Sequence, residues 1–542
     1  MAQLSQATKK LIGHYKAGEE SLNLTGDTPT IHVDEVAAKV AAFYEKIRGI
    51  IDWREEHLLK RNAIERILKR RVLMGIDLAK DESTRESIAE PLVFELIRGG
   101  HYPNDKIAET KITEVQKIID KYIFILKNTP QAENGQEALN FYNWLLGIAS
   151  CEVEESLSSS YKERALIEYM FESMKECIML NEGVLALKPM KEEEKNVQIF
   201  IAVNRALFKL DAPVIGYHLL KYKYPDWRTI GHKDLSMISK DMLTTRTRIE
   251  RNINHPLADK FYQICEKYDT PYLLLGDVMS SEPLGVEEKF SKPEVLEESI
   301  REAYAARVKT LKKRIGRAAI YATISIFITK IVFAMGIEIP VDKYLNSFNY
   351  LSLGINILTP PILMFFLVNT IRVPGQENLE RVIFEAMKII HETEKKDCYE
   401  IKTAGSKKRN LGIKAIIDLV YLLTFILSIG FIVWLLTALT FSVLSIIIFI
   451  VFISLIAFTG TKIRQRSKEL QIIDEKESFF NLLVDLFAMP LIEVGKWLTS
   501  KWQRYNIISA LFNILIDMPF MIFVEFIEQW RYFLKEKKDQ IH

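Results

Sequence analysis

LVYLLTFILSIGFIVWLLTALTFSVLSIIIFIVFISLIAFTGT, residues 419–461, contains no charged side chain. This stretch is about twice as long as the ~20 apolar residues that one α-helix needs to cross a bilayer. The tetrapeptide TALT, residues 437–440, lies near its centre, and we place a tight turn there. The stretch therefore predicts a helical hairpin that crosses a membrane twice, over residues 415–436 and 440–459.

Two further apolar stretches precede the hairpin. Residues 318–337 carry Lys330 as their single charge, and residues 350–371 carry no charge at all. Each stretch is long enough to span a bilayer. Since a soluble protein can bury one such stretch but not four of them separated by polar loops, the sequence predicts four transmembrane helices.

The distribution of basic residues predicts the orientation of these helices. Lysine and arginine are concentrated in residues 301–317, 372–414 and 462–468, whereas the loops on the other side hold only Lys343. This asymmetry favours a cytoplasmic (inner) membrane protein with both termini in the cytoplasm. The N-terminal residues MAQLSQATKK lack an apolar signal-peptide core, so we expect the first span to direct insertion.

The charge-rich N-terminal half predicts a helical domain. Apolar side chains recur at helical spacing from about residue 34 to residue 74, and no useful length of strand alternation is present. The fold class is thus all-α, with a soluble helical domain followed by a transmembrane domain and two amphipathic interfacial helices. The predicted parts are a helical cytoplasmic domain (1–285), a linker with a charged helix (286–317), a four-span domain (318–461) and membrane-interface helices (462–542).

Catalytic fingerprints are missing from the sequence. No phosphate-binding loop, dinucleotide-binding glycine pattern, zinc-protease motif or hydrolase elbow is present. The four cysteines are widely spaced, which favours free thiols over a zinc site or a disulfide framework. We therefore expect no enzymatic activity, no cofactor and no metal.

A basic run, LLKRNAIERILKRR at residues 58–71, is open to two interpretations. It could bind anionic lipid or RNA, or it could form the solvated face of an amphipathic helix. The interspersed Glu65 and the leucines at helical spacing favour the solvated face. With 72 basic and 70 acidic residues in the whole chain, no nucleic-acid partner is expected.

Two features inside the predicted spans suggest function. Lys330 lies near the middle of the first span, where a charge costs about 3 kcal/mol or more unless it reaches the headgroups or pairs. Pro360 and Pro361 lie mid-way along the second span and predict a kinked or broken helix. Its freed carbonyls could line a polar path together with Asn356, Thr359 and Asn369. A transporter or channel would use both features. A lysine that only snorkels and a helix bent for packing are the structural alternatives.

The C-terminal region repeats one word, FNLLVD at 480–485 and FNILID at 512–517. Each copy places an asparagine and an aspartate four residues apart on a narrow polar stripe, which consists of Asn481, Asp485, Asn513 and Asp517. The remaining positions are largely apolar, and tryptophans follow each copy. We predict that residues 478–500 and 506–534 form amphipathic helices lying along the cytoplasmic membrane interface.

The combination of SIFITKIVFA, IEIPVDKY, INILTPPILM, KIRQRSKEL and the closing FNILIDMPFMIFVEFIEQWRYFLKEKK resembles a family of uncharacterised bacterial multi-pass membrane proteins. The similarity covers most of the chain and implies a helical cytoplasmic domain, four spans and an amphipathic tail. It implies no activity or site residues. We therefore expect a non-enzymatic membrane-organising or interaction protein, whose partners are the lipid bilayer and cytoplasmic proteins that bind residues 1–300. The alternative is a transporter or channel component that uses Lys330 and the Pro-broken helix.

Overall fold

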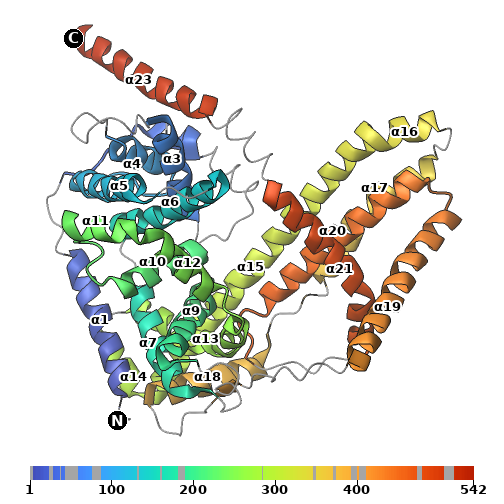
Figure 1. Ribbon diagram of the computed structural model, residues 1–542, viewed down its shortest axis with the longest axis horizontal. Helices are drawn as coiled ribbons and strands as arrows, with labels where there is room; N and C mark the ends of the chain where they lie inside the picture. The colour runs from blue at the N-terminus through green and yellow to red at the C-terminus, as the bar shows by residue number, and fades with distance from the viewer. Residues whose placement is uncertain are drawn as a thin grey trace.

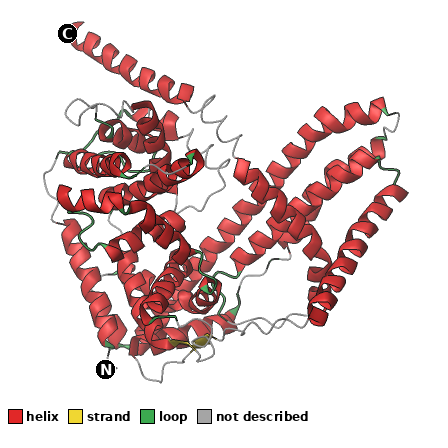
Figure 2. Ribbon diagram, in the orientation of Figure 1, coloured by secondary structure: helices red, strands yellow, loops and turns green. Residues whose placement is uncertain are grey.

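The computed structural model is almost entirely helical, as predicted (Figure 2). It describes residues 4–23, 29–36, 38–42, 59–75, 87–130, 134–158, 161–180, 190–282, 285–345, 349–369, 371, 374–391, 399–401, 411–472, 479–505 and 518–541. Figure 1 shows a mass of packed helices on one side and a group of long apolar helices on the other, joined by the long helix α15.

The helices that precede α15 form what we call the helical body. They are α1 (Gln6–Asn23), α3 (Leu59–Gly75), α4 (Ala89–Arg98), α5 (Thr110–Asn128), α6 (Gly135–Leu157), α7 (Tyr161–Cys177), α9 (Glu192–Phe208), α10 (Ala212–Lys223), α11 (His232–Lys240), α12 (Met242–Ile253), α13 (Ala258–Ser281) and α14 (Val286–Ser291). Side-chain caps begin two of them. Asn134 accepts hydrogen bonds from the first amides of α6, and Asp211 accepts one from Val214 N–H at the start of α10.

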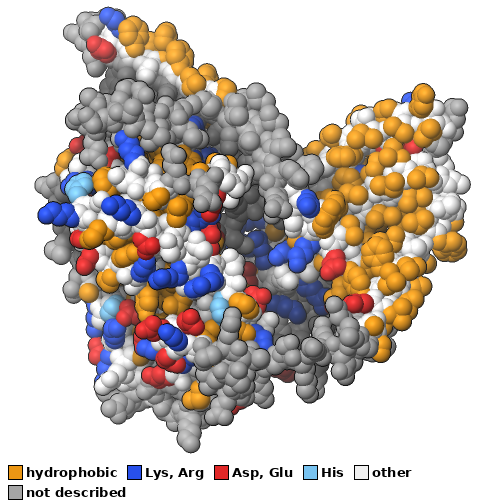
Figure 3. Space-filling view, viewed as in Figure 1, with side chains coloured by type: hydrophobic (Ala, Val, Ile, Leu, Met, Phe, Trp, Pro, Cys, Tyr) orange, Lys and Arg blue, Asp and Glu red, His pale blue; other side chains and the backbone are white. Residues whose placement is uncertain are grey.

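The remaining helices form the bundle and its extensions. They are α15 (Pro293–Phe333), a π-helical turn (Ala334–Glu338), α16 (Ile339–Tyr344), α17 (Tyr350–Asn369), α18 (Gln376–His391), α19 (Leu411–Ala438), α20 (Val443–Ser467), α21 (Phe479–Tyr505) and α23 (Met518–Ile541). We call α15 from residue 318 onward, together with α16, α17, α19, α20 and α21, the bundle. In Figure 3 its visible face is dominated by hydrophobic side chains, whereas the helical body shows mixed charge.

The prediction of four spans was wrong in one respect. Among the described residues, three helices are long and apolar enough to cross a membrane, namely Pro293–Tyr344, Asp418–Ala438 and Val443–Ser467. The other predicted span corresponds to α17, whose described apolar stretch, Ser352–Val368, is shorter. Pro360 and Pro361 lie inside α17 without breaking it, so the predicted broken helix is also corrected.

The core of the helical body continues into the bundle. One cluster of buried residues includes Phe261 of α13, Ile300 and Ile315 of α15, Val382 of α18 and Ile463 of α20. Packing therefore links α15 to the helical body through α13 and α14, and it links α20 to α15. This continuity places the bundle and the body in a fixed relation rather than at two ends of a free linker.

Segments between the predicted second and third spans also join the helical body. The buried face of α18 packs against α13 and α15, and Ser5 N–H donates to the Ile390 carbonyl at 3.0 Å. Two short strands that the sequence did not indicate, β1 (Ile178–Leu180) and β2 (Tyr399–Ile401), pair in parallel. The predicted boundaries at residues 285 and 317 thus do not coincide with an edge of the hydrophobic core.

Helix α21 packs against α20. It crosses α20 near the middle of both helices, where a methyl group on Gly495 would overlap the Ser454 carbonyl (Figure 1). Only a residue without a Cβ allows this approach, so glycine fixes the crossing point. That residues 478–500 lie along the cytoplasmic membrane interface stays a prediction.

Helix α23 lies against the helical body, away from the bundle (Figure 1). Val524 packs on Ala41, and Arg531 Nε lies 3.4 Å from Asp34 Oδ2. Ile522, Phe523, Phe526 and Trp530 are exposed on this helix. A helix that lies at a membrane interface needs exposed apolar side chains of this kind. Contact between α23 and lipid stays a prediction.

Candidate functional site

A cluster of polar side chains lies inside the bundle, among apolar helices. Lys330 Nζ lies 3.2 Å from Glu338 Oε2, and the other Glu338 oxygen accepts a hydrogen bond from Asn356 Nδ2. The Ser445 hydroxyl lies 2.5 Å from Glu338 Oε1 and 3.1 Å from Asp342 Oδ2, so it can donate to either carboxylate. We call these five residues the bundle cluster.

The bundle cluster is almost fully enclosed by the chain. Lys330 and Asn356 are 0 % exposed, Glu338 and Ser445 are 1 % exposed, and Asp342 is 6 % exposed. The Lys330 ammonium also lies 5.1 Å from the centre of the Phe452 ring, where the negative face of the ring adds attraction. Since burying a lone charge in apolar surroundings is costly, mutual pairing is what permits these groups to be here.

Local sequence explains how Glu338 reaches Lys330. In a regular α-helix, two residues eight apart differ by about 80° around the axis and do not face each other. Pro340 lies in the first turn of α16, has no N–H, and would clash with the Gly336 carbonyl in a regular helix. The π-helical turn at Ala334–Glu338 precedes it, and such a turn changes the angular offset between Lys330 and Glu338.

Lys330 was singled out from the sequence, but its partner was not. The structure confirms that Lys330 faces protein, because its side chain is buried and paired rather than extended to the surface. The signal that was missed is IEIPVDKY, which places Glu338 and Asp342 directly after an apolar stretch. Pro360 and Pro361 lie on α17, one turn beyond Asn356, and carry no polar side chain into the cluster.

The predicted polar stripe is described only in part. Asp485 of α21 pairs with Arg464 of α20 at 3.0 Å, with both side chains nearly half exposed. Asn481 belongs to α21, whereas Asn513 and Asp517 lie outside the described residues. An exposed pair of this kind contributes little stability.

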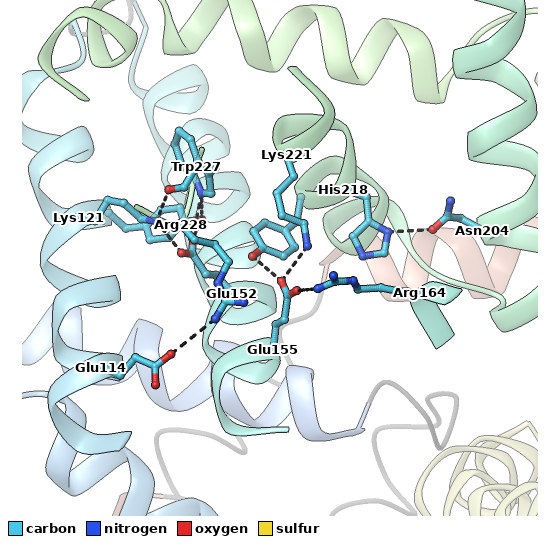
Figure 4. Close-up of polar contacts among 12 residues, drawn as sticks. Glu114, Lys121, Glu152, Glu155, Arg164, Asn204, His218, Lys221, Trp227 and Arg228 are labelled. Carbon is cyan, nitrogen blue, oxygen red and sulfur yellow. Dashed lines mark hydrogen bonds and ion pairs between the residues drawn. The ribbon is translucent and has the colours of Figure 1, made fainter. Parts of the chain in front are cut away.

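A second polar network lies in the helical body, at the C-terminal half of α6 (Figure 4). Glu152 is 1 % exposed, and its carboxylate accepts from Lys121 Nζ at 2.5 Å, Tyr122 OH at 2.7 Å and Trp227 Nε1 at 2.9 Å. Lys121 also donates to the Trp227 carbonyl at 3.0 Å. The carboxylate of Glu152 therefore joins α5, α6 and the segment that carries Trp227. Such an arrangement holds helices in position, and the carboxylate is not left free for catalysis.

Glu155 lies one turn further along α6 and is equally engaged. It accepts from Tyr217 OH at 2.6 Å and pairs with Lys221 at 2.8 Å and with Arg164 at 2.6 Å (Figure 4). Burial alone would raise the pKa of this carboxyl, but Lys221, Tyr217 and Arg164 outweigh burial and lower the pKa to about 2. Nearby, His218 hydrogen-bonds Asn204, and burial lowers its pKa to about 4.

We expect the Glu155 network to make the protein acid-sensitive. The carboxyl has a lower pKa in the folded chain than in the unfolded chain, so the unfolded state takes up the proton first as pH falls from about 4.5 to about 2. The wild type should lose unfolding free energy over this window, and Glu155→Gln should lose less. Denaturant unfolding followed by circular dichroism at several pH values measures the difference. Glu193→Gln, at an exposed position in α9, should keep the wild-type acid sensitivity.

The basic run at residues 58–71 is not the solvated face that the sequence favoured. Arg61 is 2 % exposed and pairs with Glu65 at 2.6 Å and with Asp211 at 2.5 Å. Arg70 pairs with Glu95, which is itself buried. These cations are neutralised by the chain's own carboxylates, which leaves them poorly placed to bind phosphate.

Neither metal-ligand geometry in the described ranges nor similarity to known proteins adds a further site. Within the described ranges, no group of three or more His, Cys, Asp or Glu side chains is arranged to hold a metal ion. Comparisons with protein-family models, curated proteins and solved structures found no match to this chain. The resemblance noted from the sequence stays an expectation, and function is argued from side-chain geometry alone.

Proposed function

We propose that this chain is a non-enzymatic integral membrane protein that holds a large helical body at the cytoplasmic face of the membrane, where the body binds protein partners. The observation that carries this proposal is the continuous core shared by the body and the bundle. Residues of α13, α15, α18 and α20 pack in one cluster, so the apolar helices support the body rigidly. A tether alone would not require such packing.

The polar networks support a scaffolding role over an enzymatic one. Glu152, Glu155 and Arg61 are buried or nearly so, and each is bound by side chains of its own chain. A catalytic acid or base must instead contact a substrate within hydrogen-bond reach. Groups held this way fix the relative positions of α5, α6, α10 and α3, which is useful in a body that presents a defined surface to partners.

Site-specific photo-crosslinking in native membranes tests the proposal. Tyr222 and Met237 are 63 % and 66 % exposed on the helical body, and Tyr344 is 88 % exposed at the far end of the bundle. A photoreactive residue at Tyr222 or Met237 should yield a protein adduct of defined mass. The same group at Tyr344 should yield none. Adducts absent from both body positions, or equal at all three, would contradict the proposal.

A transporter or channel component is the second candidate, and the bundle cluster is the observation that favours it. Buried charges within a membrane-spanning bundle are functional suspects by default. Against this candidate, an open cavity of about 340 Å³ between α17 and α20 is lined by Leu363, Phe366, Leu367, Ile453, Ile456 and Ala457. Those side chains offer an ion no ligands, so the cavity does not extend the cluster into a path.

Cysteine labelling decides the topology on which both candidates depend. In a background without the native cysteines, Tyr344→Cys should react with a membrane-impermeant thiol reagent in intact cells, because the basic-residue asymmetry places this end outside. Ser500→Cys should react only in inverted vesicles. Labelling of both positions from outside would show that α21 crosses the membrane, and it would raise the transporter candidate above the scaffold.

A further inference from the structure

Three lysines on α15, which we call the lysine patch, have no partner of their own in the described chain. Lys309, Lys312 and Lys313 are exposed, and no residue that the structure describes forms an ion pair or a hydrogen bond with their ammonium groups. Nearer the helical body, by contrast, Arg307 of the same helix pairs with Asp277 of α13. Figure 3 shows lysine and arginine side chains gathered in the hollow between the helical body and the bundle. Cations that the chain does not neutralise attract an anion from outside it.

The lysine patch lies where the uncharged part of the bundle ends. Helices α15 and α20 pack side by side and run in opposite directions, and Lys330 of α15 lies against Phe452 of α20. From this contact toward the helical body, α15 reaches its next cation, Arg317, after about 20 Å, and α20 reaches its first, Lys462, after about 15 Å. Charges therefore begin at nearly the same level on two neighbouring helices, as they do where a bilayer places its headgroups. The patch lies within about 12 Å of that level along the axis of α15.

The side of α15 that carries the patch continues into the apolar stretch as an exposed apolar surface. Residues eleven apart on an α-helix differ by only about 20° around its axis, so Ile320 lies on the same side as Lys309. Ile324 stands in the same relation to Lys313. The two isoleucines are 58 % and 50 % exposed. Between them and the patch lies Gly316, where a Cβ would meet no other part of the described chain within 4 Å. One side of a single helix thus offers cations, then an unobstructed position, then apolar side chains.

This order of groups matches an anionic phospholipid. Clustered lysines next to a membrane-spanning helix attract a negatively charged headgroup, whereas a zwitterionic headgroup has no net charge for them to attract. The acyl chains of the same molecule extend toward the bilayer centre, which is the direction in which Ile320 and Ile324 follow the patch. RNA or inorganic phosphate would also be attracted to the lysines, but neither has an apolar part that could lie along the isoleucines.

We propose that the side of α15 from Lys309 to Ile324 binds an anionic phospholipid of the cytoplasmic leaflet. The headgroup phosphate lies on the lysine patch, and an acyl chain lies along the two isoleucines. The proposal rests on the membrane-spanning bundle of the proposed function, but it needs no protein partner. Because α15 packs against α13 and α14, a lipid held here ties the position of the helical body to the lipid composition of the leaflet.

Native mass spectrometry of the full-length protein in detergent tests the site. The probes are dioleoylphosphatidylglycerol and dioleoylphosphatidylcholine, which carry the same acyl chains and differ in the net charge of the headgroup. The phosphatidylglycerol should bind saturably and at least about tenfold more tightly than the phosphatidylcholine. Equal affinity for the two lipids would show that lipid only coats the apolar surface, and it would overturn the inference.

Substitutions assign the preference to the lysine patch. Replacing all three of its lysines by glutamine removes three charges, each worth about fivefold in affinity at a membrane surface, so the preference for phosphatidylglycerol should disappear. The replaced side chains are exposed and unpaired within the described chain, so the variant should keep the helical content of the wild type in circular dichroism.

A matched control removes the same charge from exposed lysines of the helical body. It combines Lys127→Gln, Lys233→Gln and Lys240→Gln. This control has the same net charge as the patch variant and should keep the wild-type preference for phosphatidylglycerol. An equal loss of preference in the control, or an unchanged preference in the patch variant, would contradict the assignment.

Competition separates a lipid site from a general anion site. Glycerol 3-phosphate carries the charge of the headgroup without acyl chains, so even in large excess it should leave the phosphatidylglycerol bound. Displacement by glycerol 3-phosphate, by inorganic phosphate or by an RNA oligonucleotide would show that the lysines take any anion, and would overturn the inference. The photo-crosslinks from Tyr222 and Met237 report the scaffold role separately. Loss of the lipid preference with those crosslinks intact would therefore sink this inference alone.

Discussion

Lys330→Leu should destabilise the bundle by about 3–5 kcal/mol, because it leaves the Glu338 carboxylate buried without its cation. Asn356 and Ser445 would still donate to that carboxylate, but they carry no charge to offset the desolvation. Unfolding of the detergent-solubilised protein, followed by circular dichroism, measures the loss. If Lys330 merely extended to the headgroups, its replacement by leucine would be close to neutral or stabilising.

A double-mutant cycle separates the contribution of the Lys330–Glu338 ion pair from other effects of Lys330→Leu. Lys330→Leu combined with Glu338→Leu removes both charges, and replacing a buried ion pair by apolar side chains is often neutral. The double variant should therefore be more stable than Lys330→Leu alone, with a coupling of about 1–3 kcal/mol. Thr329→Val, at the neighbouring exposed position, should change stability by less than about 0.5 kcal/mol. A Lys330→Leu variant that behaves like this control would show that the pair does not form.

The features that follow from hydropathy were predictable from the sequence. The all-α class was correct, and three described helices are long and apolar enough to span a membrane, because long uncharged runs have few other stable conformations. The cost of a charge in an apolar span predicted that Lys330 either pairs or reaches the headgroups, and the structure shows it buried and paired. Each of these inferences uses only the local composition of about 20 residues.

Features that depend on contacts distant in sequence were not predictable. The Lys330–Glu338 pair needs a π-helical turn, which periodicity does not encode. Helix α18 looked like a charged loop segment, but its apolar face packs against α13 and α15. Glu152 looked like one more charge in CEVEESL, and only folding brings Lys121 and Trp227 to it. The word FNLLVD predicted an amphipathic helix, yet its position depends on Gly495 meeting α20.

The stability of the helical body should be most sensitive to substitutions in the Glu152 network. Glu152→Leu removes the acceptor shared by Lys121, Tyr122 and Trp227, and it leaves an ammonium whose side chain is only 10 % exposed without its carboxylate. Burial already lowers the pKa of Lys121, so losing Glu152 should lower it further and favour the neutral amine. We expect a loss of about 3–5 kcal/mol in the unfolding free energy of the body.

Graded substitutions at α6 show which property of Glu152 matters. Glu152→Gln keeps an oxygen for Tyr122 or Trp227 but removes the charge, so its loss should fall between that of Glu152→Leu and the wild type. Glu137→Leu, at an exposed position in the first turn of the same helix, should cost no more than about 1 kcal/mol, since it removes only a favourable charge near the helix N-terminus. Urea unfolding monitored by circular dichroism and tryptophan fluorescence reports both the helices and Trp227. If Glu152→Leu were as mild as Glu137→Leu, α5, α6 and the Trp227 segment would be held together by apolar packing alone, and the carboxylate would be free for a role that the scaffold proposal does not give it.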